Sequence, residues 1–268
     1  MLTTFADAQS IAEAFVAARQ KALGFASYPG KLPSDLDQAY VIQDAAIALR
    51  GGAPVGWKVG RINTPWLERL SVNRLAGPIF ASHVKNGVAD SPVTGNIFRD
   101  GFGAVEAEFL FRIGRTPKAG KTSFSLTEAA DLIDSVFIGI EVASSPFPGI
   151  NSLGPLVTIS DFGNNNGLII GEEIPDWRES GLESWLVEAQ IDGQSVGQGQ
   201  ASAFPDGPVG SVQFLLENLI TRGITITPGM LVSTGAASGV HEITDGQHFE
   251  VHFDNFGRIE CTIKYATA

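Results

Sequence analysis

Cysteine, basic residues and long apolar segments are all scarce in this sequence of 268 residues. Cys261 is the single cysteine, which excludes a disulfide framework and a cysteine-rich zinc site. Only 18 Lys and Arg stand against 29 Asp and Glu, and the net charge of −11 repels nucleic acids and anionic membranes at long range. No apolar run approaches the roughly 20 residues of a membrane span, and the first residues lack a signal-peptide pattern. We therefore expect a cytoplasmic globular protein that binds neither nucleic acid nor membrane.

The arrangement of apolar residues changes once along the chain. Residues 4–23 show helical spacing, and a second helix is predicted from Ser34 or Asp35 to residue 49, before Gly51. Short apolar runs with frequent glycines then predict strands at 55–59, 103–112, 136–142, 167–170, 185–191, 230–234, 249–253 and 258–265, with helices at 126–133 and 209–222. This order predicts an α+β fold with a helical N-terminal portion, residues 1–54, and a mostly β body, residues 55–268.

Two glutamates lie two positions apart in one of the predicted strands. Because side chains alternate between the faces of a strand, Glu106 and Glu108 must point the same way, about 6.5–7 Å apart along the backbone. Two carboxylates at that spacing repel each other unless something positive lies between them. The pattern is compatible with an ordinary solvated acidic pair or with a cation site.

A third glutamate favours the cation site. Glu141 stands alone inside the apolar run 136–143, where an unpaired carboxylate costs several kcal/mol or more. A structural ion pair would satisfy Glu141 by itself. Three carboxylates on two strands, with no nearby surplus of Lys or Arg, instead suit a hard divalent ion such as Mg²⁺ or Mn²⁺.

Lys58 and two loops supply further candidate groups. Lys58 lies in a short apolar strand bounded by glycines, either as an edge residue or as a functional ammonium beside the acidic cluster. The polar stretch 159–167 contains Asp161 and Asn164, and turn chemistry alone explains its Asn and Gly residues. Thr234 and Gly235 belong to the loop of small residues 233–239, whose backbone N–H groups could approach an anion, although a plain turn explains this loop equally well.

Two other patterns are set aside. Residues 114–122 resemble a phosphate-binding loop, but the spacing is one residue too long and no helix opens there. His248 and His252 lie on one face of a strand about 13 Å apart, too far to chelate one ion together. We interpret both histidines as surface residues.

The order and spacing of these motifs resemble the hydratase and decarboxylase branch of the fumarylacetoacetate hydrolase family. The similarity runs from residues 39–43 through Gly56–Gly60 and Gly77–Ala81 to the glutamate motifs, Ser160–Asp161 and Thr234–Ala236. It implies a mixed β-sandwich roll, a homo-oligomer and Mg²⁺ or Mn²⁺ held by Glu106, Glu108 and Glu141. No catalytic histidine dyad like that of the family's C–C hydrolases is found in the sequence.

The resemblance also implies roles for the remaining candidates. Lys58, Ser82, His83 and Asp161 are the expected catalytic residues, and Lys58, Asn164, Thr234 and Gly235 are the expected substrate contacts. Ser82 and His83 stand where the family's hydratases carry an aspartate, and Phe162 replaces an asparagine after Asp161. Both differences concern proton transfer and the substrate pocket rather than the metal ligands.

The implied reaction is the addition of water to a 2-hydroxy-2,4-dienoate, which gives a 4-hydroxy-2-oxo acid. Three alternatives stay open at this stage. The first is a decarboxylase of 4-oxalocrotonate-type dicarboxylates, which an added basic residue near the pocket would favour. The others are a related C–C hydrolase or tautomerase, and a binding protein that has lost proton transfer.

Overall fold

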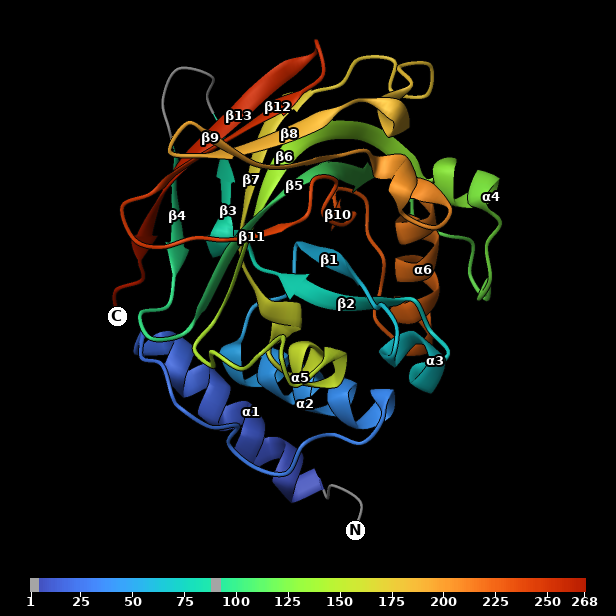
Figure 1. The fold of residues 1–268 in the computed structure, drawn as a ribbon. Helices are drawn as coiled ribbons and strands as arrows, with labels where there is room; N and C mark the ends of the chain where they lie inside the picture. Colours follow the sequence, from blue (N-terminus) through green and yellow to red (C-terminus); the bar gives the residue numbers. More distant parts are fainter. Residues whose placement is uncertain (1–4, 88–92) are drawn as a thin grey trace.

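The computed structural model describes residues 5–87 and 93–268 (Figure 1). Both predicted N-terminal helices are present, as α1 (Phe5–Gln20) and α2 (Leu36–Arg50). The Asp35 side chain caps α2 by accepting a hydrogen bond from the Gln38 N–H, and Gly51, with φ 73°, ends it. Helix α1 stops earlier than predicted, because Ala22 already adopts a left-handed conformation with φ 51°.

The body consists of two mixed sheets, in agreement with the α+β expectation. The larger, eight-stranded sheet has the order β2-β1-β10-β5-β6-β7-β3, and β11 pairs with β5. Its strands are β1 (Gly56–Arg61), β2 (Arg74–Ile79), β3 (Val84–Asn86), β5 (Phe102–Ile113), β6 (Ile133–Ser145), β7 (Asn165–Glu173), β10 (Leu231–Ser233) and β11 (Val240–Glu242). The five-stranded sheet has the order β4-β13-β12-β8-β9, formed by β4 (Val93–Ile97), β8 (Val187–Ile191), β9 (Gln194–Gly199), β12 (His248–Phe253) and β13 (Gly257–Tyr265). The main apolar core lies between these sheets and extends to α6.

Short helices fill the connections. These are α3 (Trp66–Leu70), α4 (Leu126–Ala130), α5 (Pro155–Ser160), η1 (Ala81–His83), η2 (Phe162–Asn164), η3 (Leu182–Ser184), η4 (Ala201–Ala203) and the longer α6 (Gly207–Thr221). The predicted helix 126–133 is cut to one turn, because β6 begins at Ile133. Helix α5 was not predicted from the sequence. In the described part of the chain, no helix is long and apolar enough to cross a membrane.

The larger sheet curls strongly on itself. Lys58 on β1 and Glu141 on β6 are three strand spacings apart, about 14 Å if the sheet were flat. Their Nζ and Oε2 atoms nevertheless lie 3.2 Å apart. Gly77 on β2 helps this closure, because a Cβ atom there would lie 2.2 Å from the Phe162 carbonyl oxygen. The concave face of the sheet therefore brings distant strands to one point.

The N-terminal helices pack against the body rather than standing apart. Helices α1, α2 and α5 lie together beneath the larger sheet (Figure 1) and share an apolar cluster that includes Phe15, Ile42 and Phe162. Arg19 of α1 forms a two-pronged ion pair with Asp161, with Nε–Oδ1 at 2.6 Å and Nη2–Oδ2 at 2.9 Å. Contacts thus cross residue 54, and a domain boundary at that position stays a prediction.

The Arg19–Asp161 pair should contribute strongly to stability. Its side chains are only 9% and 1% exposed, so Asp161→Asn leaves a buried guanidinium without its carboxylate and should lower the free energy of unfolding by about 3–5 kcal/mol. Asp134→Asn is the matched control, because the Arg112–Asp134 pair is 38% and 47% exposed and should contribute less than about 1 kcal/mol. Urea unfolding of the two variants measures both values. Equal losses of unfolding free energy in the two variants would contradict the larger contribution predicted for the buried pair.

Candidate metal centre and active site

The three glutamates singled out from the sequence meet on the concave face of the larger sheet. Glu106 and Glu108 lie on one face of β5, and Glu141 on β6 is directly opposite Glu106 in the antiparallel register. Their side chains are buried, and one carboxylate oxygen from each lies within 4.8 Å of the others. The alternate residues of β5, Val105 and Ala107, face the main core, which fixes the direction of the glutamates. The strand pattern therefore builds a compact cluster of three carboxylates.

Burial and mutual repulsion perturb these groups strongly. Burial raises the pKa of Glu106 to about 7, against the opposing effect of Lys58. The pKa of Glu108 is also well above its usual range, first because of burial and then because of Glu141 and Glu106. Burial alone would lower the pKa of Lys58, but the nearby carboxylates of Glu141, Glu106 and Glu108 raise it instead. The lysine stays charged, and the cluster contains three acidic groups and one basic group.

Each of two glutamates keeps one oxygen free of hydrogen bonds. Glu108 Oε2 accepts hydrogen bonds from the Ser233 hydroxyl and the Gly235 backbone N–H, whereas its buried Oε1 has no hydrogen-bond partner. Glu141 Oε1 accepts a bond from Asn165 Nδ2 at 2.9 Å, and its Oε2 contacts only the Lys58 ammonium. Buried oxygens without hydrogen bonds are rare in folded proteins, and hard divalent cations bind to such atoms. The donor set therefore fits a divalent cation.

A cavity opens beside this cluster. It measures about 360 Å³, and its walls include Lys58, Glu106, Asn164 and Arg61. The Lys58 ammonium lies 3.3 Å from Asn164 Oδ1, and Asn164 Nδ2 donates to Asn151 Oδ1 at 3.1 Å. An anionic ligand in this space would meet one buried ammonium and one guanidinium. The site is suited to a small carboxylate held next to a cation.

Comparison with known proteins agrees with the geometry. The family profile described as "Fumarylacetoacetate (FAA) hydrolase C-terminal" matches residues 91–264, well over half of the chain. The chain belongs to the fumarylacetoacetate hydrolase family. The resemblance inferred from the sequence motifs is thereby confirmed.

Individual members of this family cover most of the chain at low identity. 2-Keto-4-pentenoate hydratases 1 and 2 of Dechloromonas aromatica (strain RCB) are 22% and 21% identical over 234 residues, which are 85% of this chain and 86% of each relative. The structure of 4-oxalocrotonate decarboxylase from Pseudomonas putida G7, complexed with magnesium and adipate, covers 98% of both chains with a TM-score of 0.79 and 18% identity. Fumarylpyruvate hydrolase from Pseudomonas aeruginosa, in complex with Mn²⁺ and pyruvate, covers 78% of this chain and 89% of its own, with a TM-score of 0.54 and 16% identity. The fold class predicted from the sequence is confirmed.

The predicted site residues do not all lie together in the structure. Lys58 and Asn164 line the cavity, and the Gly235 N–H holds Glu108. Thr234 lies just behind, where its hydroxyl donates to the Phe109 carbonyl at 2.8 Å. Asp161 is fully engaged with Arg19.

The other two predicted catalytic residues lie elsewhere. Ser82 and His83 form part of η1 and line a different cavity, together with Arg19 and Arg50. Neither of them is among the lining residues of the cavity that contains Lys58 and Glu106. The arrangement therefore does not bring Ser82 or His83 to the carboxylate cluster.

Three residues of the site were not singled out from the sequence. Arg61 is the last residue of β1 and reaches the cavity wall, although strand alternation would have placed it opposite Lys58. Asn165 was quoted only within a polar loop, and Ser233 only within a small-residue loop, yet they donate to Glu141 and Glu108. A buried glutamate requires donors, but the sequence does not tell which donor residues fold against it.

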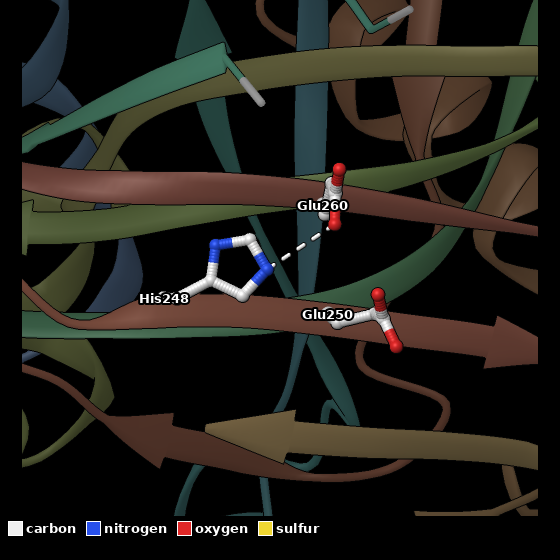
Figure 2. Close-up of side chains that lie close together, drawn as sticks. All are labelled: His248, Glu250 and Glu260. Carbon is white, nitrogen blue, oxygen red and sulfur yellow. Dashed lines mark ion pairs between the residues drawn. The ribbon is translucent and has the colours of Figure 1, made fainter. Parts of the chain in front are cut away.

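A second group of potential metal ligands lies on the five-stranded sheet. His248, Glu250 and Glu260 each offer an atom within 4.8 Å of the others, with a 3.2 Å ion pair between His248 and Glu260 (Figure 2). Glu250 is already bound by His252 at 2.6 Å and by Arg258 at 2.9 Å. These half-exposed groups form an ion-pair network, in which His248 pairs with Glu260 and His252 pairs with Glu250.

The two glutamate clusters give a direct test of the metal site. Mg²⁺ or Mn²⁺ should raise the melting temperature of the unaltered protein, because a ligand that binds only the folded state stabilises it. Glu108→Gln should lose most of this rise, whereas Glu260→Gln on the other sheet should keep it. Thermal unfolding with and without the cation measures the shift. If Glu108→Gln keeps the full rise, the metal centre is misplaced.

Proposed function

We propose that this protein is a divalent-metal-dependent hydratase that adds water to a 2-hydroxy-2,4-dienoate and releases a 4-hydroxy-2-oxo acid. The observation that carries the proposal is the cluster of three buried carboxylates, in which Glu108 and Glu141 leave oxygens without hydrogen bonds, next to Lys58. Membership of the fumarylacetoacetate hydrolase family and the similarity to two hydratases support it. Mg²⁺ or Mn²⁺ as the specific ion, a homo-oligomeric state and a cytoplasmic location remain predictions.

Glu106, Glu108 and Glu141 would hold the cation. When bound, it would supply Lewis-acid stabilisation to negative charge that develops on the 2-oxygen of a 2-oxo acid. Ser233 and the Gly235 N–H orient Glu108, and Asn165 orients Glu141, so that the remaining oxygens point to a common centre. These neighbours fix the ligand geometry before any substrate arrives.

Lys58 is the residue that we assign to substrate and proton handling. Its ammonium is buried, charged and held by Asn164 at the cavity wall. There it can bind the substrate carboxylate and pass a proton during ketonisation, which places a hydrogen on the terminal carbon of the dienoate. The resulting unsaturated 2-oxo acid is electrophilic at its distal alkene carbon. Water then adds its oxygen to carbon 4 and its hydrogen to carbon 3.

Lys58→Met tests this role. We expect turnover to fall about 10²–10⁴-fold, the usual contribution of a positioned acid–base group. Calorimetry should show that Mg²⁺ or Mn²⁺ still binds, since the three carboxylates remain. Lys118→Met, at an exposed position in a distant loop, is the matched control and should keep full turnover. Unchanged turnover in Lys58→Met would remove the lysine from the mechanism.

One observation favours a second candidate, the decarboxylation of a 4-oxalocrotonate-type 2-oxo dicarboxylate. Arg61 lines the same cavity as Lys58, and its guanidinium donates to the carbonyl of Ala203 at 3.3 Å. Among the described residues no carboxylate lies within ion-pair distance of Arg61. A guanidinium left free in this position could bind a second substrate carboxylate.

Substrate comparison with an Arg61 variant distinguishes the two reactions. The Mg²⁺-loaded enzyme is incubated with 2-hydroxypentadienoate and with 4-oxalocrotonate, while ultraviolet absorbance and released CO₂ are followed. If the dicarboxylate is the substrate, Arg61→Gln should lower kcat/KM for it about ten- to a hundred-fold and Arg61→Lys should lower it less. Turnover of the dienoate, which has a single carboxylate, should change little in either variant. No turnover of either compound would refute both proposals.

A further inference from the structure

A second cavity lies away from the carboxylate cluster. It measures about 470 Å³ and is lined by residues of α1, α2, η1, η2, β3, β4, β6 and β7 and by C-terminal residues. None of its lining residues is an aspartate or glutamate, whereas four of them are basic in type: Arg19, Arg50, His83 and Lys85. This is unexpected in a chain with net charge −11.

Two of these cations have no acidic partner in the part of the chain that the structure describes. Arg50 donates to the Gly51 carbonyl and to the Ser82 hydroxyl, and Lys85 donates to the Thr94 carbonyl. Within the described residues, neither lies within ion-pair distance of a carboxylate. Arg19 differs, because Asp161 neutralises it. Two positive charges in the cavity wall therefore have no acidic partner among the described residues.

The surroundings show the resulting positive potential. The pKa of His83 falls to about 4, first because of burial and then because of Arg19, Arg50 and Lys85. The pKa of Arg50 is also lowered, by burial and by the Arg19 charge. Gathering like charges in a partly buried space costs free energy, which an anion in the same space would recover.

The cavity wall is shaped to hold an anion in a fixed place. The Arg50 guanidinium stacks on the Phe80 ring, 3.7 Å from its centroid, while Ser82 fixes one end. A guanidinium held in this way presents its planar N–H donors without further loss of side-chain freedom. Phe98 and Phe162 supply an apolar part of the wall.

We propose that this cavity is a binding site for a small multivalent oxyanion, a carboxylate or phosphoryl compound, with its charge placed between Arg50 and Lys85. Ser82 and His83 would provide neutral hydrogen-bond donors beside these two cations. This assignment gives Ser82 and His83, which the family resemblance implied to be catalytic, a role in the second cavity. It is independent of the reaction proposed for the carboxylate cluster.

Calorimetric titration at low ionic strength tests the site. Inorganic phosphate and malonate are titrated separately into the full-length protein without divalent cations, so that no cation in the glutamate cluster can recruit the anion. We expect saturable binding of at least one of them, weakened about ten-fold or more in Arg50→Gln and in Lys85→Gln. The stronger ligand of the two identifies the phosphoryl or the carboxylate class.

Matched variants separate this site from the catalytic one. Arg115→Gln and Lys118→Gln remove the same charges at exposed positions of a distant loop and should leave the affinity unchanged. Lys58→Gln should also leave it unchanged, whereas anion binding at the carboxylate cluster would be lost in that variant. The absence of binding of both anions, or its loss in Lys58→Gln alone, overturns the proposal.

A structural readout does not depend on any variant. A crystal soaked in selenate should show an anomalous selenium peak between the side chains of Arg50 and Lys85. A peak only in the cavity of Lys58 and Glu106 would overturn the proposal, as would an empty map at both places.

Discussion

Burial of three carboxylates around one ammonium is the constraint on which this structure depends. Glu108 and Glu141 are fully buried, and the Lys58 ammonium lies 3.2 Å from Glu141 Oε2. Bringing such groups together is unfavourable, so the fold supplies donors to two of the carboxylates from two further segments: Ser233 and the Gly235 N–H from one, and Asn165 from the other. The sheet has to curl to bring these segments to one centre. The shape of the larger sheet and the composition of the site therefore have a common physical cause.

Charge also divides the molecule into two contrasting cavities. The one beside Glu106 adjoins a buried cluster of three glutamates, whereas the one beside Arg50 has no acidic lining residue. The ligands proposed for them differ accordingly: a divalent cation with a carboxylate beside it for the first, and an oxyanion alone for the second. The low charge content of the chain, 18% of residues, makes such a local concentration of cations informative. In a chain with a more highly charged surface, a cluster of four basic side chains would be less unusual.

The sequence was sufficient for the parts of the site that follow from local periodicity. The two-residue spacing of Glu106 and Glu108 determines that both face one side of a strand, and the apolar run around Glu141 predicts its burial. The places of Ser82 and Arg61 depend instead on how strands far apart in the sequence come together. Short strands such as β3, β4 and β11 were also missed, since their pairing partners, rather than their own residues, make them strands.

Three asparagines that follow Asp161, Asn164 to Asn166, connect helix α1 to the carboxylate cluster. Asn164 accepts from Lys58, Asn165 donates to Glu141, and the side chain of Asn166 accepts from Arg19 at 3.2 Å. The side chains of three consecutive residues thus join helix α1, near the start of the chain, to Lys58 and to a glutamate of the carboxylate cluster. A change in the position of α1 would therefore act on the same short segment that supports Lys58 and Glu141.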